Sequence, residues 1–122
     1  MLGNQKGIPV YIAAGASLST AALMGDGVLV GILMPTVWTA ASLTFQWSYD
    51  GQNWYELYDT TPAEVTLALT VGTGQMNAIN TNPNPFLGVV AIKVRSGTLG
   101  AAVNQVAAAT VILVTRKLFA LR

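Results

Sequence analysis

The stretch that decides the fold is Ser42–Gly51, with the sequence SLTFQWSYDG. Every second side chain in it is apolar, and these are Leu43, Phe45, Trp47 and Tyr49. Side chains alternate across a β-strand, so these four share one face. Asp50-Gly51 follows at once and predicts a tight hairpin, because glycine tolerates the positive φ that such turns require. We therefore expect a strand over 42–49, a hairpin with Trp54 folded back over the strand pair, and a returning strand over 54–58.

Further strand patterns lie on both sides of this hairpin, separated by residues typical of turns. The segments are 8–14, 28–34, 63–71, 75–79, 88–95 and 110–118. Asp26-Gly27 predicts a turn, and the Asn-Pro repeat over 80–85 predicts a loop. For 101–109, helix, extended chain and surface loop all remain open, since its alanines permit helix and Val103 and Asn104 oppose it.

Seven or eight short strands with regular turn signals predict an all-β fold. We expect a two-sheet antiparallel β-sandwich, and within that class a jelly-roll-like topology, because it closes both sheets over one core. The last strand, 110–118, is apolar on both faces. Val111 and Leu113 point one way, and Ile112 and Val114 point the other. Such a strand lies between two layers, or between one layer and a partner.

Composition points to one domain that associates with others. The 122 residues suit a single domain over 1–122, and no linker is visible. Hydrophobic residues make up 52% and charged residues 9%, whereas an average soluble domain has about 25% charged residues. Few charges are therefore left to cover the surface, so we expect a homo-oligomer. The ends, 1–7 and 117–122, are either arms that reach a neighbour or frayed ends.

Several function classes lack their usual residues. The formal net charge is +1, and no dense basic stripe exists, so we expect no nucleic-acid partner. Glycine, proline, asparagine and threonine interrupt every long uncharged stretch, so we expect no membrane partner. Histidine and cysteine are both absent, which removes the commonest general base, the thiolate nucleophile and the usual transition-metal ligands. We expect no enzymatic activity, no catalytic residue, no metal and no cofactor.

Aromatic residues supply the candidate contact site. Trp38, Trp54, Tyr55 and Tyr58 are the residues that we predict to contact a ligand or a partner. Flat aromatic faces stack on sugar rings, so a carbohydrate is one candidate ligand. The alternative is that these side chains pack in the core or in a protein interface, as aromatic residues more often do. The oxygen-bearing residues Asp50, Asn53, Glu56 and Asp59 match no EF-hand spacing.

The order of several short segments resembles small proteins encoded among the head genes of tailed bacteriophages. These segments are GILMP over 31–35 with Trp38-Thr39, LTFQ over 43–46, SYDG over 48–51, VRSGT over 94–98, VNQ over 103–105 and ILV over 112–114. The resemblance spans roughly 17–114. It implies a β-sandwich virion structural protein of the capsid decoration or cement type, with no catalytic motif.

The resemblance also implies partners and a location. The expected partners are other copies of the chain, as a homotrimer, and the major capsid protein. The expected location is the virion, after assembly in the host cytoplasm. The alternative is a carbohydrate-binding or host-attachment β-sandwich module on the particle.

Overall fold

A computed structural model of the chain describes residues 5–25, 27–69, 71, 76–79, 85–86 and 89–117. These residues form strands and loops and contain no helix. The strands are β1 Gln5–Ile12, β2 Ala22–Leu23, β3 Gly27–Leu33, β4 Leu43–Ser48, β5 Tyr55–Glu56, β6 Met76–Ala78, β7 Ala91–Ser96 and β8 Ala109–Lys117.

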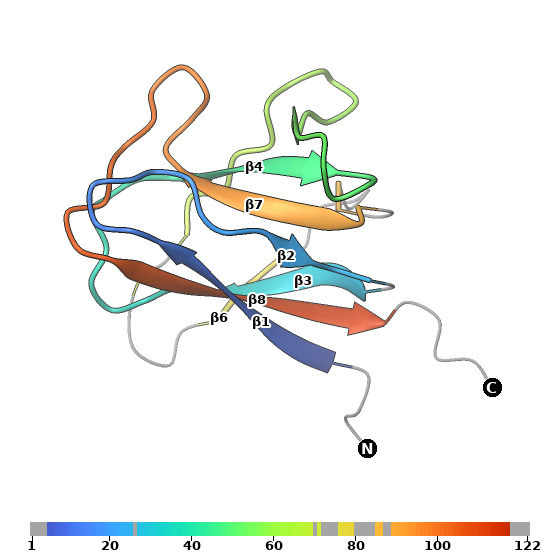
Figure 1. Ribbon diagram of the computed structural model, residues 1–122, viewed down its shortest axis with the longest axis horizontal. Coiled ribbons are helices and arrows are strands. Elements are labelled where there is room, and N and C mark those ends of the chain that lie inside the picture. Colours follow the sequence, from blue (N-terminus) through green and yellow to red (C-terminus); the bar gives the residue numbers. More distant parts are fainter. Residues whose placement is uncertain are drawn as a thin grey trace.

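The strands form two antiparallel sheets that lie one above the other (Figure 1). Sheet A has the order β1-β8-β3-β6, and sheet B has the order β2-β7-β4-β5. The pairing is nested, because β1 pairs with β8, β2 with β7, β3 with β6 and β4 with β5. Two further pairs, β3 with β8 and β4 with β7, complete the sheets. The predicted two-sheet antiparallel sandwich is confirmed.

The core lies between the sheets and is built from alternating inward side chains. Val111 and Leu113 of β8 and Ile92 and Val94 of β7 are fully buried there. Phe45 of β4 packs edge-on against Phe86, with ring centroids 5.0 Å apart and an interplanar angle of 81°. This T-shaped geometry is one that aromatic quadrupoles favour.

The apolar face predicted for 42–49 is confirmed in β4. Leu43 and Phe45 are fully buried, and Trp47 packs against the core from its margin. The predicted last strand is confirmed over Ala109–Lys117, one residue earlier than expected. The strand expected over 28–34 is β3, and the one expected over 75–79 contains β6.

The strand predicted over 63–71 is wrong. Its described residues form only single bridges, Glu64 with Tyr58 and Leu67 with Leu43. The period of two is nevertheless present, because Val65, Leu67, Leu69 and Val71 all pack on the core. The segment crosses from one neighbour to another, so no single strand accompanies it for long enough to build a ladder.

Other boundaries move, and one strand was missed. β1 begins at Gln5, so residues 5–7 belong to a sheet, and β7 begins at Ala91, later than 88. The returning strand expected over 54–58 shrinks to Tyr55–Glu56. β2 is two residues long, too short for any periodic signal. Segment 101–108 is a loop. Residues 1–4, 26, 80–84 and 118–122 lie outside the described residues, so the arms and the turn and loop expected there remain predictions.

Candidate functional site

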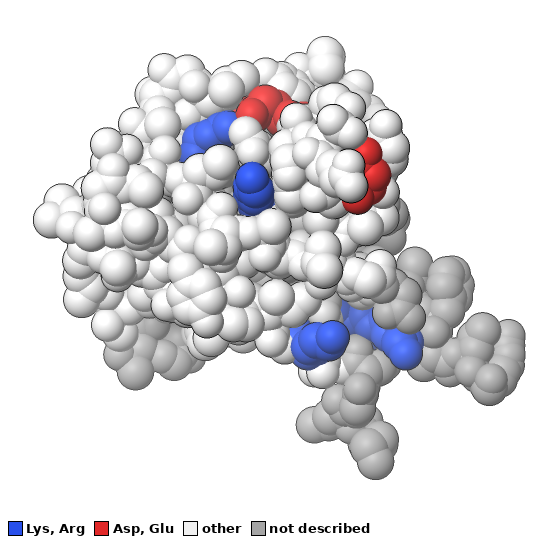
Figure 2. Space-filling model, in the orientation of Figure 1, with Lys and Arg blue, Asp and Glu red and all other residues white. Residues whose placement is uncertain are grey.

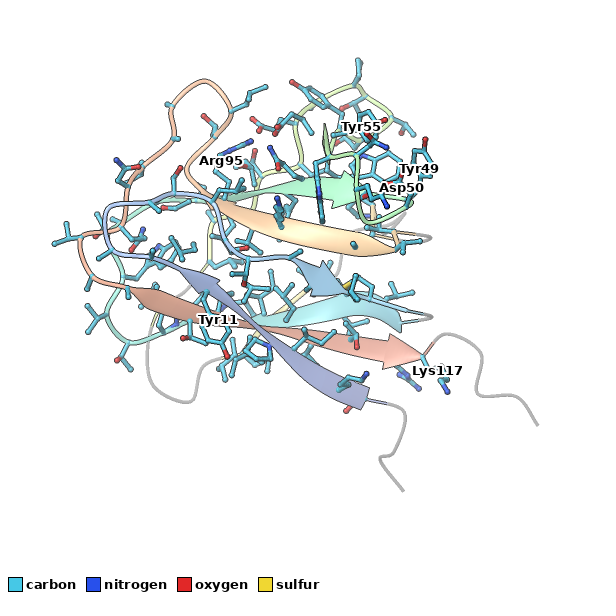
Figure 3. All side chains as sticks on the ribbon, in the orientation of Figure 1. Tyr11, Tyr49, Asp50, Tyr55, Arg95 and Lys117 are labelled. Atoms are coloured by element: carbon cyan, nitrogen blue, oxygen red, sulfur yellow. The ribbon has the colours of Figure 1, made fainter. Side chains whose placement is uncertain are left out.

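Charged and polar side chains gather on the outer face of sheet B. Strand alternation places Thr44, Gln46 and Ser48 of β4 on that face, because Leu43 and Phe45 fill the core. Thr44 is paired in register with Arg95 of β7, and Gln46 with Lys93. Figure 3 shows Arg95 beneath the two loops that rise above this sheet.

Arg95 is the centre of a buried ionic network. Its side chain is only 8% exposed. Nη2 donates to Glu56 Oε2 at 2.8 Å, and Nη1 lies 2.7 Å from Glu56 Oε1 and 3.4 Å from Glu64 Oε2. Nη1 also lies 3.3 Å from the hydroxyl oxygen of Thr44. Gln46 donates to Glu56 Oε2 at 2.9 Å, so five side chains from three parts of the chain meet here.

The network keeps both partners charged. The hydrogen bond from Arg95 lowers the pKa of Glu56, against the desolvation that would raise it. The same hydrogen bond to Glu56 raises the pKa of Arg95. Glu56 Oε1 is buried and has no well-aligned hydrogen-bond donor among the described residues, so its short contact with Nη1 is ionic. Removing the guanidinium would leave two partly buried carboxylates without compensation.

The network also ties two loops to the sheet. Glu64 lies in the connection 57–67, and its Oε2 accepts the backbone N–H of Leu99 at 3.0 Å. Thr44 donates to the carbonyl of Gly97 at 2.7 Å. Gly97 has a φ of +91°, and a Cβ there would lie 2.5 Å from the carbonyl oxygen of Ala101. This loop therefore needs glycine at its first turn to reach back over the strands.

The hairpin after β4 is a turn held by its own side chains. Asp50 Oδ1 accepts the backbone N–H groups of Gln52 and Asn53, each at 2.9 Å. These two bonds, first that from Asn53, hold the pKa of Asp50 well below its usual range. Ser48 Oγ accepts the N–H of Gly51 at 2.7 Å, and Gly51 has a φ of +78°. Asp50 is thus occupied as a turn residue, as the sequence predicts.

The four predicted contact residues do not form one platform. Trp54, just before β5, lies on the outer face, where the Lys93 ammonium is 4.5 Å from its ring centroid, whereas Tyr55 of β5 points to the other face and contacts Trp47. Trp38 donates its indole N–H to the carbonyl of Ala41 at 3.2 Å and packs against the core. Tyr58 is 49% exposed and bridges to Glu64 instead.

A different aromatic cluster stands at the margin of the core. Tyr49 and Tyr55 are 60% and 45% exposed, and their rings are nearly parallel at 8° with centroids 6.2 Å apart. Trp47 lies 5.9 Å from Tyr55 and 6.4 Å from Tyr49 between ring centroids. The charge repulsion between the two phenols raises the pKa of Tyr55. Figure 3 shows both tyrosines at the hairpin end of the sheet. Tyr49 was identified only as a strand residue in the sequence.

Gln105 is a further residue that sequence reasoning missed. It is 1% exposed, although it lies in the loop after β7. Its amide donates to the carbonyl of Thr39 at 3.0 Å and to Ser96 Oγ at 2.7 Å, and its carbonyl oxygen accepts the N–H of Thr39 at 2.8 Å. It therefore joins two loops at one end of the sandwich. A lone glutamine among alanines carries no sequence signal for such a role.

The described acids show no metal site. Asp59 Oδ1 accepts the backbone N–H groups of Thr61 and Ala63 and the hydroxyl of Thr61, which together lower the pKa of Asp59. No group of three or more acidic side chains within the described ranges is placed to hold a metal ion. The same ranges contain no helix with the length and apolar character needed to cross a bilayer.

Comparison of this chain with protein families, with curated proteins and with solved structures finds no match. Its function must therefore be argued from its own residues and geometry.

Proposed function

We propose that this chain is a virion structural protein of a tailed phage, a capsid decoration or cement subunit that stabilises the head through contacts with its own copies and with the major capsid protein. The observation that carries the proposal is the nested pairing of the strands. We infer from this pairing a jelly roll, in which a long hairpin of strands folds over itself, and this fold recurs in viral capsid and lectin domains.

Two further features support a role in assembly. Sheet A presents an apolar outer face, and the chain has few charges with which to keep a monomer apart from its neighbours. The ionic network on sheet B ties loops in place, which suits a scaffold. A fold alone does not determine function, so the proposal also takes weight from the order of the segments that resembles head proteins.

The direct test is to find the chain on particles. Antibodies raised against the purified protein should label the heads of tailed-phage particles from the host that carries its gene, as seen in electron micrographs. Heads that lack the protein should release DNA at a lower temperature, and adding purified protein should restore the wild-type release temperature. Particles without label, or heads whose stability does not depend on the protein, would contradict the proposal.

Carbohydrate binding is the second candidate, and the exposed Tyr49–Tyr55 pair beside Trp47 favours it. Aromatic faces at the rim of a jelly roll offer a surface for sugar rings. Titration with a panel of oligosaccharides should then quench tryptophan fluorescence, and Tyr55→Ala should abolish the quenching. Tyr58→Ala is the matched control, because Tyr58 is similarly exposed but lies outside the cluster. Equal effects of the two variants, or no quenching at all, would exclude this site.

A further inference from the structure

The outer face of sheet A carries apolar side chains that are exposed or half-buried. Val111 and Leu113 fill the core, so Ile112 and Val114 point outward. Residues paired in register share a face, and Ile112 is paired with Pro9 on one side and Leu33 on the other. Tyr11 and Met76 complete the face, and they are 53% and 52% exposed. We call this surface the open face.

The open face has a ridge and a groove that run side by side across the strands. The ridge is the register row Pro9, Ile112, Leu33 and Met76. The groove is the next row, Gly7, Val114, Gly31 and Ala78. Side chains of the ridge lean over the groove, since a Cβ on Gly7 would lie 3.1 Å from Ile112 Cγ2 and one on Gly31 would lie 3.0 Å from Met76 Sδ. Glycine at both positions therefore keeps the groove row lower than the ridge, with Gly7 exposed and Gly31 buried beneath the Met76 side chain.

We propose that the open face packs against the open face of a second copy of this chain, with the ridge of each copy in the groove of the other. A two-fold axis that lies between the two rows, parallel to them, produces this fit. It places β8 across from β8, with Ile112 of one copy facing Val114 of the other. The inference deepens the proposed assembly role and rests on it.

The charge on the face selects the same arrangement. Arg116 is its one charged residue among those described, and it lies in the row beyond the groove, paired with Gln5. Tyr11 and Thr110 form the row beyond the ridge. The proposed axis separates the two Arg116 side chains and brings each beside Tyr11 of the other copy, where a cation–π contact can form. An axis parallel to the strands would instead place the two guanidinium groups together.

Figure 2 shows one group of basic residues at the end where β1 begins and β8 ends, and a second group near the acidic residues over the other sheet. Figure 3 places Tyr11 and Lys117 toward opposite ends of β8. Two copies in opposite directions therefore keep their basic ends apart.

The projected area of the face reaches the lower end of the areas that specific interfaces bury. Four strands at a spacing of about 4.8 Å, with rows about 6.7 Å apart, give roughly 500 Å² in projection. Side-chain relief increases this toward the ~800 Å² per partner of a standard interface.

Strand addition at the β1 edge is the weaker alternative. The Tyr11 N–H already donates to Thr20 Oγ1 and the Tyr11 carbonyl accepts the Thr20 N–H, while Pro9, which points to the same edge, has no N–H to donate.

The test is the mass of the purified protein at micromolar concentration, measured by light scattering. We expect wild type to be a dimer, or a larger assembly of pairs. Ile112→Lys and Val114→Lys each place a charge at the centre of the contact and should weaken dimerisation at least about 100-fold. Leu23→Lys is the matched control, because Leu23 is an exposed leucine on sheet B, and it should keep the wild-type mass. Circular dichroism and a thermal melt check that the variants fold.

A cross-linking experiment tests the register without altering the charge. The chain has no cysteine, so single-cysteine variants report one contact each. A short bismaleimide should join Ile112→Cys to Val114→Cys in a mixture of the two, more efficiently than it joins Gln52→Cys, on the exposed hairpin, to either.

A monomeric wild type, a trimer, or dimers that survive both lysine substitutions would overturn this inference. The homotrimer that the resemblance implies would count against this inference, because a trimer needs a head-to-tail contact that the two-fold arrangement does not provide. Labelled phage heads together with any of these outcomes would leave the proposed function standing. A dimer that forms through the open face, together with phage heads that carry no label, would support this inference and contradict the proposed function.

Discussion

Sheet A and sheet B pack on the same core but treat their outer faces differently. The outer face of sheet B is covered by its own chain, because loops 57–67 and 97–103 are tied down through Arg95, Glu56 and Glu64. The outer face of sheet A carries apolar side chains, of which Tyr11 and Met76 are about half exposed. The outer face of a sheet can therefore be covered by loops of the same chain, held by ion pairs, or it can be left for a partner. The predictions below test that difference.

The largest effect should come from removing the guanidinium that ties the cover to sheet B. Arg95→Met keeps the aliphatic stem but leaves Glu56 and Glu64 without a cation. Because these carboxylates are mostly buried, we expect the free energy of unfolding to fall by about 3 kcal/mol in urea titrations. Arg116→Met, at the exposed end of sheet A, should change it by less than about 0.5 kcal/mol. Similar losses in both variants would show that the network contributes little.

A smaller but still large effect should come from the loop itself. Gly97→Ala combines a φ of +91° with a Cβ placed against the backbone of the 101–103 segment. We expect the same urea titrations to show a loss of about 2 kcal/mol or more. Gly100→Ala is the control in the same loop, since nothing lies within 4 Å of its added Cβ. A loss in the control as large as in Gly97→Ala would assign the effect to loop stiffness in general.

Acid should weaken the covered face first. The pKa of Glu56 is lowered in the folded state, so its contribution to stability is present above its unfolded pKa of about 4.3. That contribution is lost as pH falls through the lower folded pKa. Asp50 and Asp59 act in the same direction. The urea midpoint of wild type should fall between pH 5 and pH 3, a window of about two units set by that unfolded pKa. In Arg95→Met the urea midpoint should fall less over this range. An equal fall would show that the pairing of Glu56 with Arg95 does not cause the pH dependence.

The smallest effect on folding should come from the open face. Gly7→Ala places a methyl group 3.1 Å from the end of the Ile112 side chain, which can shift, and Gly7 has no positive φ. We expect the free energy of unfolding to change by less than about 1 kcal/mol. The same methyl partly fills the groove, so the dimer should dissociate more readily by light scattering. A folding defect as large as that of Gly97→Ala would mean that the two glycines do not differ as described.

The sequence predicts the parts of this molecule that are set by local patterns. Alternation in 42–49 identifies the core face of β4, and Asp50-Gly51 identifies the hairpin, because both depend on neighbouring residues. The two apolar faces of 110–118 are also visible, and they correspond to the core and the open face. The segment 63–71 shows the limit, since its alternation is present without a strand beside it.

The candidate site could not be predicted to the same degree. Alternation in 88–95 predicts only that Arg95 lies on the opposite face from Val94, and the burial of Arg95 depends on Glu56 and Glu64, which are 39 and 31 residues away in the sequence. Likewise, the returning strand begins only at Tyr55, and Trp54 before it lies on the opposite face from Tyr55, which separates the predicted aromatic set. These contacts depend on where loops return, and single-sequence periodicity carries no information on that.

The pairing of Gln5 with Arg116 means that β1 and β8 run in opposite directions from a common end of the sandwich. A pull applied through these two residues would load their backbone bonds one pair after another, as a zipper opens, and would not load the whole ladder at once. The molecule should therefore yield at low force in that direction and resist force applied across the sheets. In the proposed capsid role, a subunit held by the outer face of sheet A would keep the β1–β8 ladder away from the strain of an expanding capsid.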